Sequence, residues 1–268
     1  VSNDFIHWSD PVEILRCDEV DNDPFGQIQQ LAVTRRGAQY VGLLSLMHVT
    51  EYLRTEEQNL LMEEGITETQ LAVSRDGFRW DRVANRQIFF PLGVQGQWDS
   101  AWIATQHNIV YDGDRMLFYY DASDRPRSDI PQYLIGVAEL PRDRFQALQP
   151  RKLHRDGVIE TKPLNVVEDG DLKLNINATR GRVDVELVDY DGATIEGFSR
   201  ADCNAIEDRD DLDISVRWGD RTIAQAIGMA AARPPYIRVR IYLKQASLFA
   251  ADLPDENSWP APCDYGSG

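Results

Sequence analysis

Short runs of alternating apolar and polar residues, separated by turn residues, follow one another along most of the chain. The longest is Tyr236–Leu243, in which apolar residues occupy every second position and Arg238 and Arg240 stand between them. Successive side chains of a strand point to opposite faces, so this alternation is typical of a half-buried β-strand. Turn signals such as Asp112-Gly113 separate the runs. Together they predict an all-β fold.

The first half of the chain contains two cycles of such runs. The predicted strands are residues 27–34, 40–47, 68–74 and 86–90 in the first cycle, and 101–111, 115–120 and 133–140 in the second. Between them, Glu51–Gly65 carries Leu53, Leu60 and Leu61 at helical spacing, which favours a short helical insertion over a site. A simple surface excursion is the alternative.

The pattern Ser-x-Asp-x-x-x-Trp occurs twice, as Ser2–Trp8 and as Ser74–Trp80. In each copy the Ser and Asp side chains can bond the local backbone, and we expect Trp8 and Trp80 to be buried over an outer hairpin. A repeat of this size with four short strands is typical of propeller blades. Residues 1–150 therefore predict about two blades, the first of them incomplete.

The pattern changes after residue 150. Predicted strands lie at residues 171–178, 182–188, 193–199 and 236–243, with the Asp191-Gly192 turn between the second and third. Several half-buried antiparallel strands predict a β-sandwich, which we assign to residues 151–268 together with an irregular tail.

Composition narrows the classes of function. The 268 residues carry a formal net charge of −16, which repels nucleic acid and anionic membranes, and no apolar stretch is long enough to span a bilayer. Cys17, Cys203 and Cys263 are odd in number and widely spaced, so we expect neither a zinc site nor a disulfide framework. The chain reads as a soluble protein of a reducing compartment, with the cytoplasm favoured. No phosphate-binding loop or dinucleotide fingerprint occurs, and we expect no metal or cofactor.

Several segments together resemble proteins related to glycoside hydrolase family 32. They are the Ser2–Trp8 box, Gly96–Ser100, Asp112–Tyr120, Ile135–Phe145 and Thr161–Leu164. The resemblance extends to about residue 250 and implies the C-terminal blades of a five-bladed β-propeller followed by a β-sandwich. It also implies a carbohydrate ligand and the chemistry of a glycosidase.

The same resemblance shows what the chain lacks. The family's nucleophile motif in the first blade and its Arg-Asp-Pro segment in the second are absent, and Asn22-Asp23-Pro24 lies in the wrong place to replace them. About two blades cannot close a ring and would leave sheet edges unpaired. We therefore expect a second polypeptide or an N-terminal segment to complete the propeller.

Glycosidases need two carboxyl groups facing each other across the scissile bond. Asp99 precedes the innermost strand of the last blade and is flanked by Trp98 and Trp102, aromatic residues that can stack on sugar rings. We assign Asp99 as the candidate catalytic residue and both tryptophans as substrate-binding. The alternative is that Asp99 caps a turn and Trp98 fills the gap between blades.

Further substrate-binding candidates lie on the same predicted rim. They are His48 and Glu51, His107, and the loop residues Asp121, Asp124 and Arg125. His48 and Glu51 can equally be a solvated strand end. His107 can line the axial channel, bind an axial cation or be a hydrogen-bonded core histidine. The loop group suits sugar hydroxyls but also an exposed ion-pair cluster.

Three functions follow from these features. The leading one is part of a propeller glycoside hydrolase whose nucleophile lies outside this chain. The others are a non-catalytic carbohydrate-binding module and a structural or assembly subunit.

Overall fold

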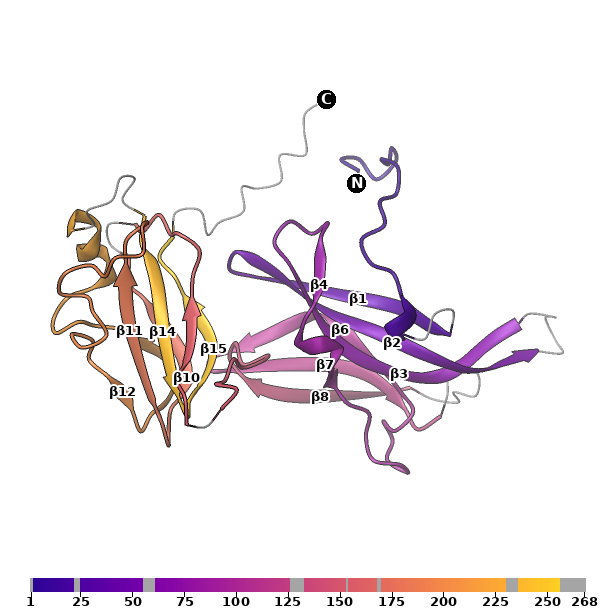
Figure 1. The fold of residues 1–268 in the computed structure, drawn as a ribbon. Helices are drawn as coiled ribbons and strands as arrows, with labels where there is room; N and C mark the ends of the chain where they lie inside the picture. Colours follow the sequence, from indigo (N-terminus) through magenta and orange to yellow (C-terminus); the bar gives the residue numbers. More distant parts are fainter. Residues whose placement is uncertain are drawn as a thin grey trace. The chain divides into compact units, whose positions relative to one another are not determined.

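The chain is all-β and divides into two compact units. The computed structural model describes residues 2–21, 25–54, 61–125, 133–152, 154–167, 170–229 and 236–255. The first unit comprises Val1–Asp112 and Met116–Glu139, and the second comprises Gly113–Arg115 and Leu140–Trp259. Both are built from antiparallel sheets (Figure 1).

The first unit contains a five-stranded and a three-stranded sheet. The five-stranded sheet has the order β1-β2-β3-β4, with β5 also paired to β3, and the other sheet has the order β6-β7-β8. Their bounds are β1 Gly26–Arg36, β2 Gln39–Arg54, β3 Leu61–Ser74, β4 Trp80–Arg82, β5 Ile88–Phe90, β6 Trp102–Asp112, β7 Arg115–Ser123 and β8 Leu134–Pro141, with short 3₁₀ turns η1 Glu19–Asp21 and η2 Ala84–Arg86.

Strands β1 and β6 bring the two sheets together. The Gln30 side chain donates a hydrogen bond to the Thr105 carbonyl (3.1 Å), and the Thr34 hydroxyl donates to the His107 carbonyl (3.0 Å). Polar side chains of one sheet therefore bond the backbone of the next.

The segment expected to be a helical insertion is extended instead. Strand β2 runs on to Arg54 and β3 begins at Leu61, and their register pairs Leu53 with Met62 and Arg54 with Leu61. Two apolar strand ends that fold back on each other mimic helical spacing in the sequence, so the prediction was wrong for both flanks. Leu60 lies outside the described residues.

The fourth strand of the first cycle is shorter than predicted. Residues 88–90 form β5, whereas Arg86 belongs to η2 and the additional strand β4 covers Trp80–Arg82. Both β4 and β5 pair with β3.

The second unit contains two sheets that share one core. Their orders are β13-β10-β15 and β12-β11-β14-β9. The bounds are β9 Gly157–Glu160, β10 Lys173–Asn177, β11 Arg182–Val188, β12 Ile206–Glu207, β13 Asp210–Ser215, β14 Arg238–Lys244 and β15 Ser247–Asp252, with the 3₁₀ helix η4 Ile223–Met229.

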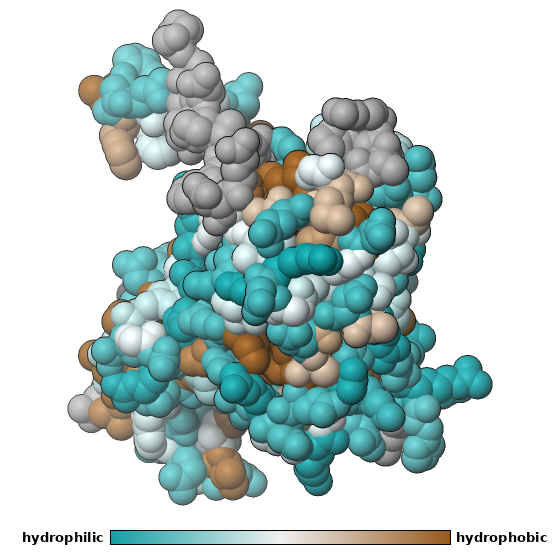
Figure 2. All heavy atoms as spheres, turned by 90° about the vertical axis from the view of Figure 1, so that its left-hand side faces the viewer, coloured by the Kyte–Doolittle hydropathy of each residue, from teal (hydrophilic) through white to brown (hydrophobic). Residues whose placement is uncertain are grey.

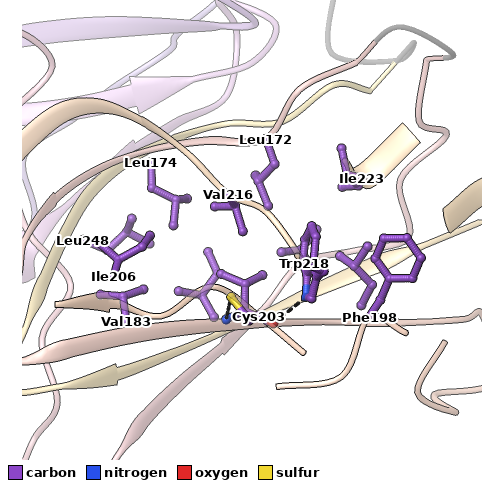
Figure 3. Packing of buried hydrophobic residues seen from close by; sticks show 14 of the residues in the cluster. Leu172, Leu174, Val183, Phe198, Cys203, Ile206, Val216, Trp218, Ile223 and Leu248 are labelled. Carbon is purple, nitrogen blue, oxygen red and sulfur yellow. Dashed lines mark hydrogen bonds between the residues drawn. The ribbon is translucent and has the colours of Figure 1, made fainter. Parts of the chain in front are cut away.

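Apolar residues of both sheets meet in this core (Figure 3). Leu174 of β10 and Val183 of β11 are fully buried, as is Trp218, whose indole N–H donates to the Val185 carbonyl (3.0 Å). Cys203 is a buried free thiol, and burial raises its pKa to about 11. In β14 the residues Ile237 to Leu243 alternate between core and surface as predicted.

One predicted strand of the second unit is irregular. Residues 193–199 make an isolated bridge from Thr194 to Val188, not a strand. Gly197 adopts φ +77°, which breaks the extended chain and allows Phe198 to turn into the core.

The start of the predicted tail is anchored. The Asn165 backbone N–H donates to the Asp255 carboxylate (2.9 Å), and that of Val167 donates to the Pro254 carbonyl (3.0 Å). The remainder of the tail, from residue 256, lies outside the described residues. Hydrophilic residues dominate the face seen in Figure 2, with apolar side chains in smaller patches between them.

Candidate functional site

The loop before β6 positions Asp99 through close backbone contacts. The Gly93 N–H donates to the Asp99 carbonyl (3.0 Å), and a Cβ on Gly93 would lie 1.9 Å from Asp99 Oδ1. Only glycine allows this approach. Gly96, at φ +89°, supplies the left-handed turn within the loop.

Asp99 meets an aromatic cluster at the end of the β6-β7-β8 sheet. The Tyr120 hydroxyl donates to Asp99 Oδ2 (3.2 Å), and the Trp98 indole stacks on the Tyr120 ring with centroids 5.5 Å apart. Phe90 packs edge-on against the same ring at 4.8 Å. Burial, followed by the neighbouring Asp99 charge, raises the pKa of Tyr120. The hydroxyl therefore stays protonated and remains a donor near neutral pH.

Two other residues of the predicted rim point to the opposite face of this sheet. Trp102 precedes Ile103, which is fully buried, and Asp121 follows the buried Tyr120, so alternation places Trp102 and Asp121 opposite the Asp99 cluster. Asp121 accepts a hydrogen bond from the Gln106 side chain (2.7 Å). The Trp102 ring meets Tyr133 edge-on at 5.1 Å. The structure thus joins Asp99 to Trp98 and separates both from Trp102 and Asp121.

The histidine in β6 is neither buried nor part of a core. The His107 side chain is exposed, and its backbone carbonyl contacts Thr34. Asp124 and Arg125 are exposed after β7, where the Arg125 N–H donates to the Ser123 hydroxyl (3.1 Å). Residue 127, the end of the predicted loop cluster, lies outside the described residues.

His48 starts a polar network that crosses the five-stranded sheet. Its Nε2 lies 3.3 Å from Glu68 Oε1, and the Gln70 amide donates to the same oxygen (3.0 Å). Gln70 accepts in turn from Arg82 (2.6 Å), and Arg82 forms a bidentate pair with Asp21 (2.5 and 2.6 Å). Both side chains of the Arg82–Asp21 pair are buried.

This network is structural in its geometry. Burial opposes ionisation of Asp21, but the hydrogen bond from Arg82 outweighs it and lowers the pKa of Asp21. Sequence reasoning found only His48 of this set. Glu51 is exposed on β2, beyond an irregularity in the register at Val49–Glu51.

Metal-binding and membrane-spanning features are missing from the part of the chain that the structure describes. Among the described residues, no group of three His, Cys, Asp or Glu side chains converges to hold a metal ion. None of the helices in the described ranges has both the length and the apolar character needed to cross a membrane.

Sequence reasoning did not select Tyr120 as a site residue. Its signal was the alternation in β7, which buries Phe118, Tyr120 and Ala122 on one face. The 21-residue separation between Tyr120 and Asp99 hid their contact.

Comparison with known proteins gives little further guidance. No family model matches the chain, and no curated protein matches it. One similar solved structure is named as a complex of BT0996 and RGII, with a TM-score of 0.34 and 14% identity, and another is named "Glycoside hydrolase", with a TM-score of 0.31 and 14% identity. Each match covers 44% of this chain and 34% of the other, so the chain spans about a third of the length of these structures. Matches of this extent and score fix neither the fold family nor the activity of the chain.

Proposed function

We propose that this chain is a carbohydrate-active protein whose glycan contact is formed by Asp99, Tyr120 and Trp98. The observation that carries the proposal is the hydrogen bond from Tyr120 to Asp99 beside the stacked Trp98 indole. A carboxylate and a hydroxyl next to aromatic rings combine polar groups for sugar hydroxyls with a surface for the sugar's apolar face. The resemblance of the motifs to glycoside hydrolase family 32 supports the same class of ligand.

In the leading form of this proposal the chain belongs to a propeller glycoside hydrolase. Its first unit contributes about two blades of a five-bladed ring, and Asp99 supplies one of the two carboxyl groups. The second carboxyl group comes from outside the chain, because a glycosidase places the pair across the scissile bond. Trp102, His48, Glu51, His107, Asp121, Asp124 and Arg125 are less favoured than Trp98 as direct ligand contacts.

The test is Asp99→Asn in the full chain, assembled with any polypeptide that co-purifies. This substitution keeps the side-chain shape but removes the charge. If Asp99 is catalytic, turnover of a cleaved oligosaccharide falls by about 10²–10⁴-fold, the usual contribution of general acid–base assistance. If Asp99 only binds, glycan affinity falls in titration calorimetry without any cleavage by the wild type.

Asp81→Asn provides the matched control, because Asp81 is an exposed carboxylate of the same unit. It should leave cleavage and affinity unchanged. Tyr120→Phe keeps the ring but removes the donor to Asp99, and we expect a smaller loss than for Asp99→Asn. Equal activity of wild type and Asp99→Asn, or no glycan bound by the wild type across a panel of oligosaccharides, would reject the proposal.

A second candidate function is an assembly subunit, and the outer face of β8 favours it. Ile135 and Val137 alternate on this face and are 77% and 56% exposed, and the adjoining Tyr133 is 51% exposed. Contiguous exposed apolar residues mark interaction surfaces. We assign this face to a sheet of a second polypeptide. Ile135→Asp should abolish that association in sedimentation velocity, whereas Val158→Asp, at an equally exposed valine of the second unit, should not.

A further inference from the structure

A shallow hollow on the second unit combines three cationic side chains with two carboxylates. It has a volume of about 480 Å³ and is lined by Asp156, Arg182, Asp184, Arg200, Ala201 and Lys244. Its volume falls within the range of small-molecule sites, about 300–1,000 Å³. The lining residues carry a net charge of +1 (three cations less two carboxylates), whereas the whole chain carries −16.

A buried carboxylate organises this hollow. Asp184, only 1% exposed, accepts from Arg182 Nε (2.8 Å) and from Arg200 Nε (2.9 Å). Arg200 also pairs with Asp156 (2.6 Å) and lies over the Tyr242 ring at 4.4 Å. The two guanidinium groups are therefore held in place before any ligand arrives.

Two positive groups at the hollow are left for a ligand. Arg182 and Lys244 are direct partners across β11 and β14, and like charges directly opposite each other destabilise a sheet. Glu207 takes Nη1 of Arg182 (2.7 Å). Among the described residues, neither Arg182 Nη2 nor the Lys244 ammonium has a hydrogen-bond partner. An anion between Arg182 and Lys244 would relieve their repulsion.

The chemistry of the lining selects the anion. A guanidinium edge matches the two oxygens of a carboxylate. A dianion such as phosphate would face Asp156 and Asp184, and a net lining charge of +1 is too small to compensate it. Asp156 uses Oδ2 for Arg200 and can accept a hydroxyl hydrogen bond with its other oxygen.

We propose that this hollow binds a singly charged, carboxylated saccharide of the size of a uronic acid. Arg182 and Lys244 hold the carboxylate, and Asp156 accepts from a ring hydroxyl. The anion site stands on the geometry of the second unit alone. That the anion is a sugar acid rests on the proposed function.

Titration calorimetry of the full chain with galacturonate tests the assignment, with galactose as the neutral counterpart. We expect galacturonate to bind at least tenfold more tightly than galactose, and its affinity to fall with added salt because the ionic contacts are screened. Lys244→Gln should raise the Kd for galacturonate at least tenfold. Lys162→Gln, at an exposed lysine of the same unit outside the hollow, should leave it unchanged.

Three outcomes would overturn the proposal. They are an unchanged Kd in Lys244→Gln, equal binding of galactose and galacturonate, and competition by inorganic phosphate as effective as that by galacturonate. Binding of galacturonate should persist in Asp99→Asn. A failure at Asp99 can therefore be distinguished from a failure at this hollow.

Discussion

The two copies of the Ser-x-Asp-x-x-x-Trp box have the same local structure but different surroundings. In both, the Ser hydroxyl accepts from the next two backbone N–H groups that face it, and the Asp carboxylate accepts from two more. The indole N–H then donates to a backbone carbonyl three residues earlier, at 3.2 Å for Trp8 and 2.9 Å for Trp80.

Burial separates the two boxes. Trp80 begins β4 and packs over β2, where a Cβ on Gly42 would lie 2.8 Å from its ring. Trp8 is 61% exposed, and residues 9–18 that follow it form neither helix nor strand. The expectation that both tryptophans are buried was therefore wrong for Trp8. The box determines its own turn, whereas burial of its tryptophan depends on an adjoining sheet.

Removing each indole should show this difference most strongly. Trp80→Ala removes a half-buried ring that packs on β2, and we expect the free energy of unfolding to fall by about 3 kcal/mol, the lower end for large aromatic residues in cores. Trp8→Ala should change it by less than about 0.5 kcal/mol, as for ordinary surface substitutions. Urea denaturation of both variants measures the two values. Equal losses would show that the boxes are equivalent after all.

Much of the sheet structure was predictable because alternation is a local signal. It correctly indicated β1, β2, β6, β7, β11 and β14. It failed at Glu51–Gly65, where the decisive pairing joins Leu53 to Met62 across the hairpin, and at residues 193–199, where Gly197 redirects the chain.

The candidate site was predictable only in part. The Gly-rich loop and its neighbouring indole drew attention to Asp99, but its contact with Tyr120 depends on how β7 lies beside the loop. The alternation of β7 could have shown that Asp121 points away from Tyr120. The Asp21–Arg82 pair joins residues 61 positions apart, and no local pattern marks it.

The backbone of the fourth box position offers a sharper comparison. Gly77 adopts φ +79° in the second box, and Phe5 adopts φ +62° at the equivalent place in the first. A left-handed conformation costs a residue with a side chain about 1–2 kcal/mol. Gly77→Ala should therefore destabilise the first unit by about 1 kcal/mol in urea denaturation. Phe5→Gly should instead protect the amide protons of Ile6 and His7 from hydrogen exchange, because it relieves the same strain. Faster exchange at these amides in Phe5→Gly would contradict this account.

The smallest expected effect concerns the two box carboxylates. The side chain of His7 lies 2.7 Å from Asp4 and is the main cause that lowers the pKa of Asp4, whereas in the second box the backbone N–H of Arg79 is the main cause that lowers the pKa of Asp76. A carboxylate with a lowered pKa stabilises its box above the unfolded pKa, about 3.9, and this contribution is lost as the pH falls through the folded pKa.

His7→Ala should therefore raise the pKa of Asp4 toward that of Asp76 and leave Asp76 unchanged, as followed by NMR titration of the two carboxyl carbons. The first box would then lose its turn at a higher pH than in the wild type. Arg79→Ala is the matched control, because it keeps the backbone N–H that bonds Asp76. A pKa of Asp4 that does not move in His7→Ala would show that backbone donors alone set the acidity of both boxes.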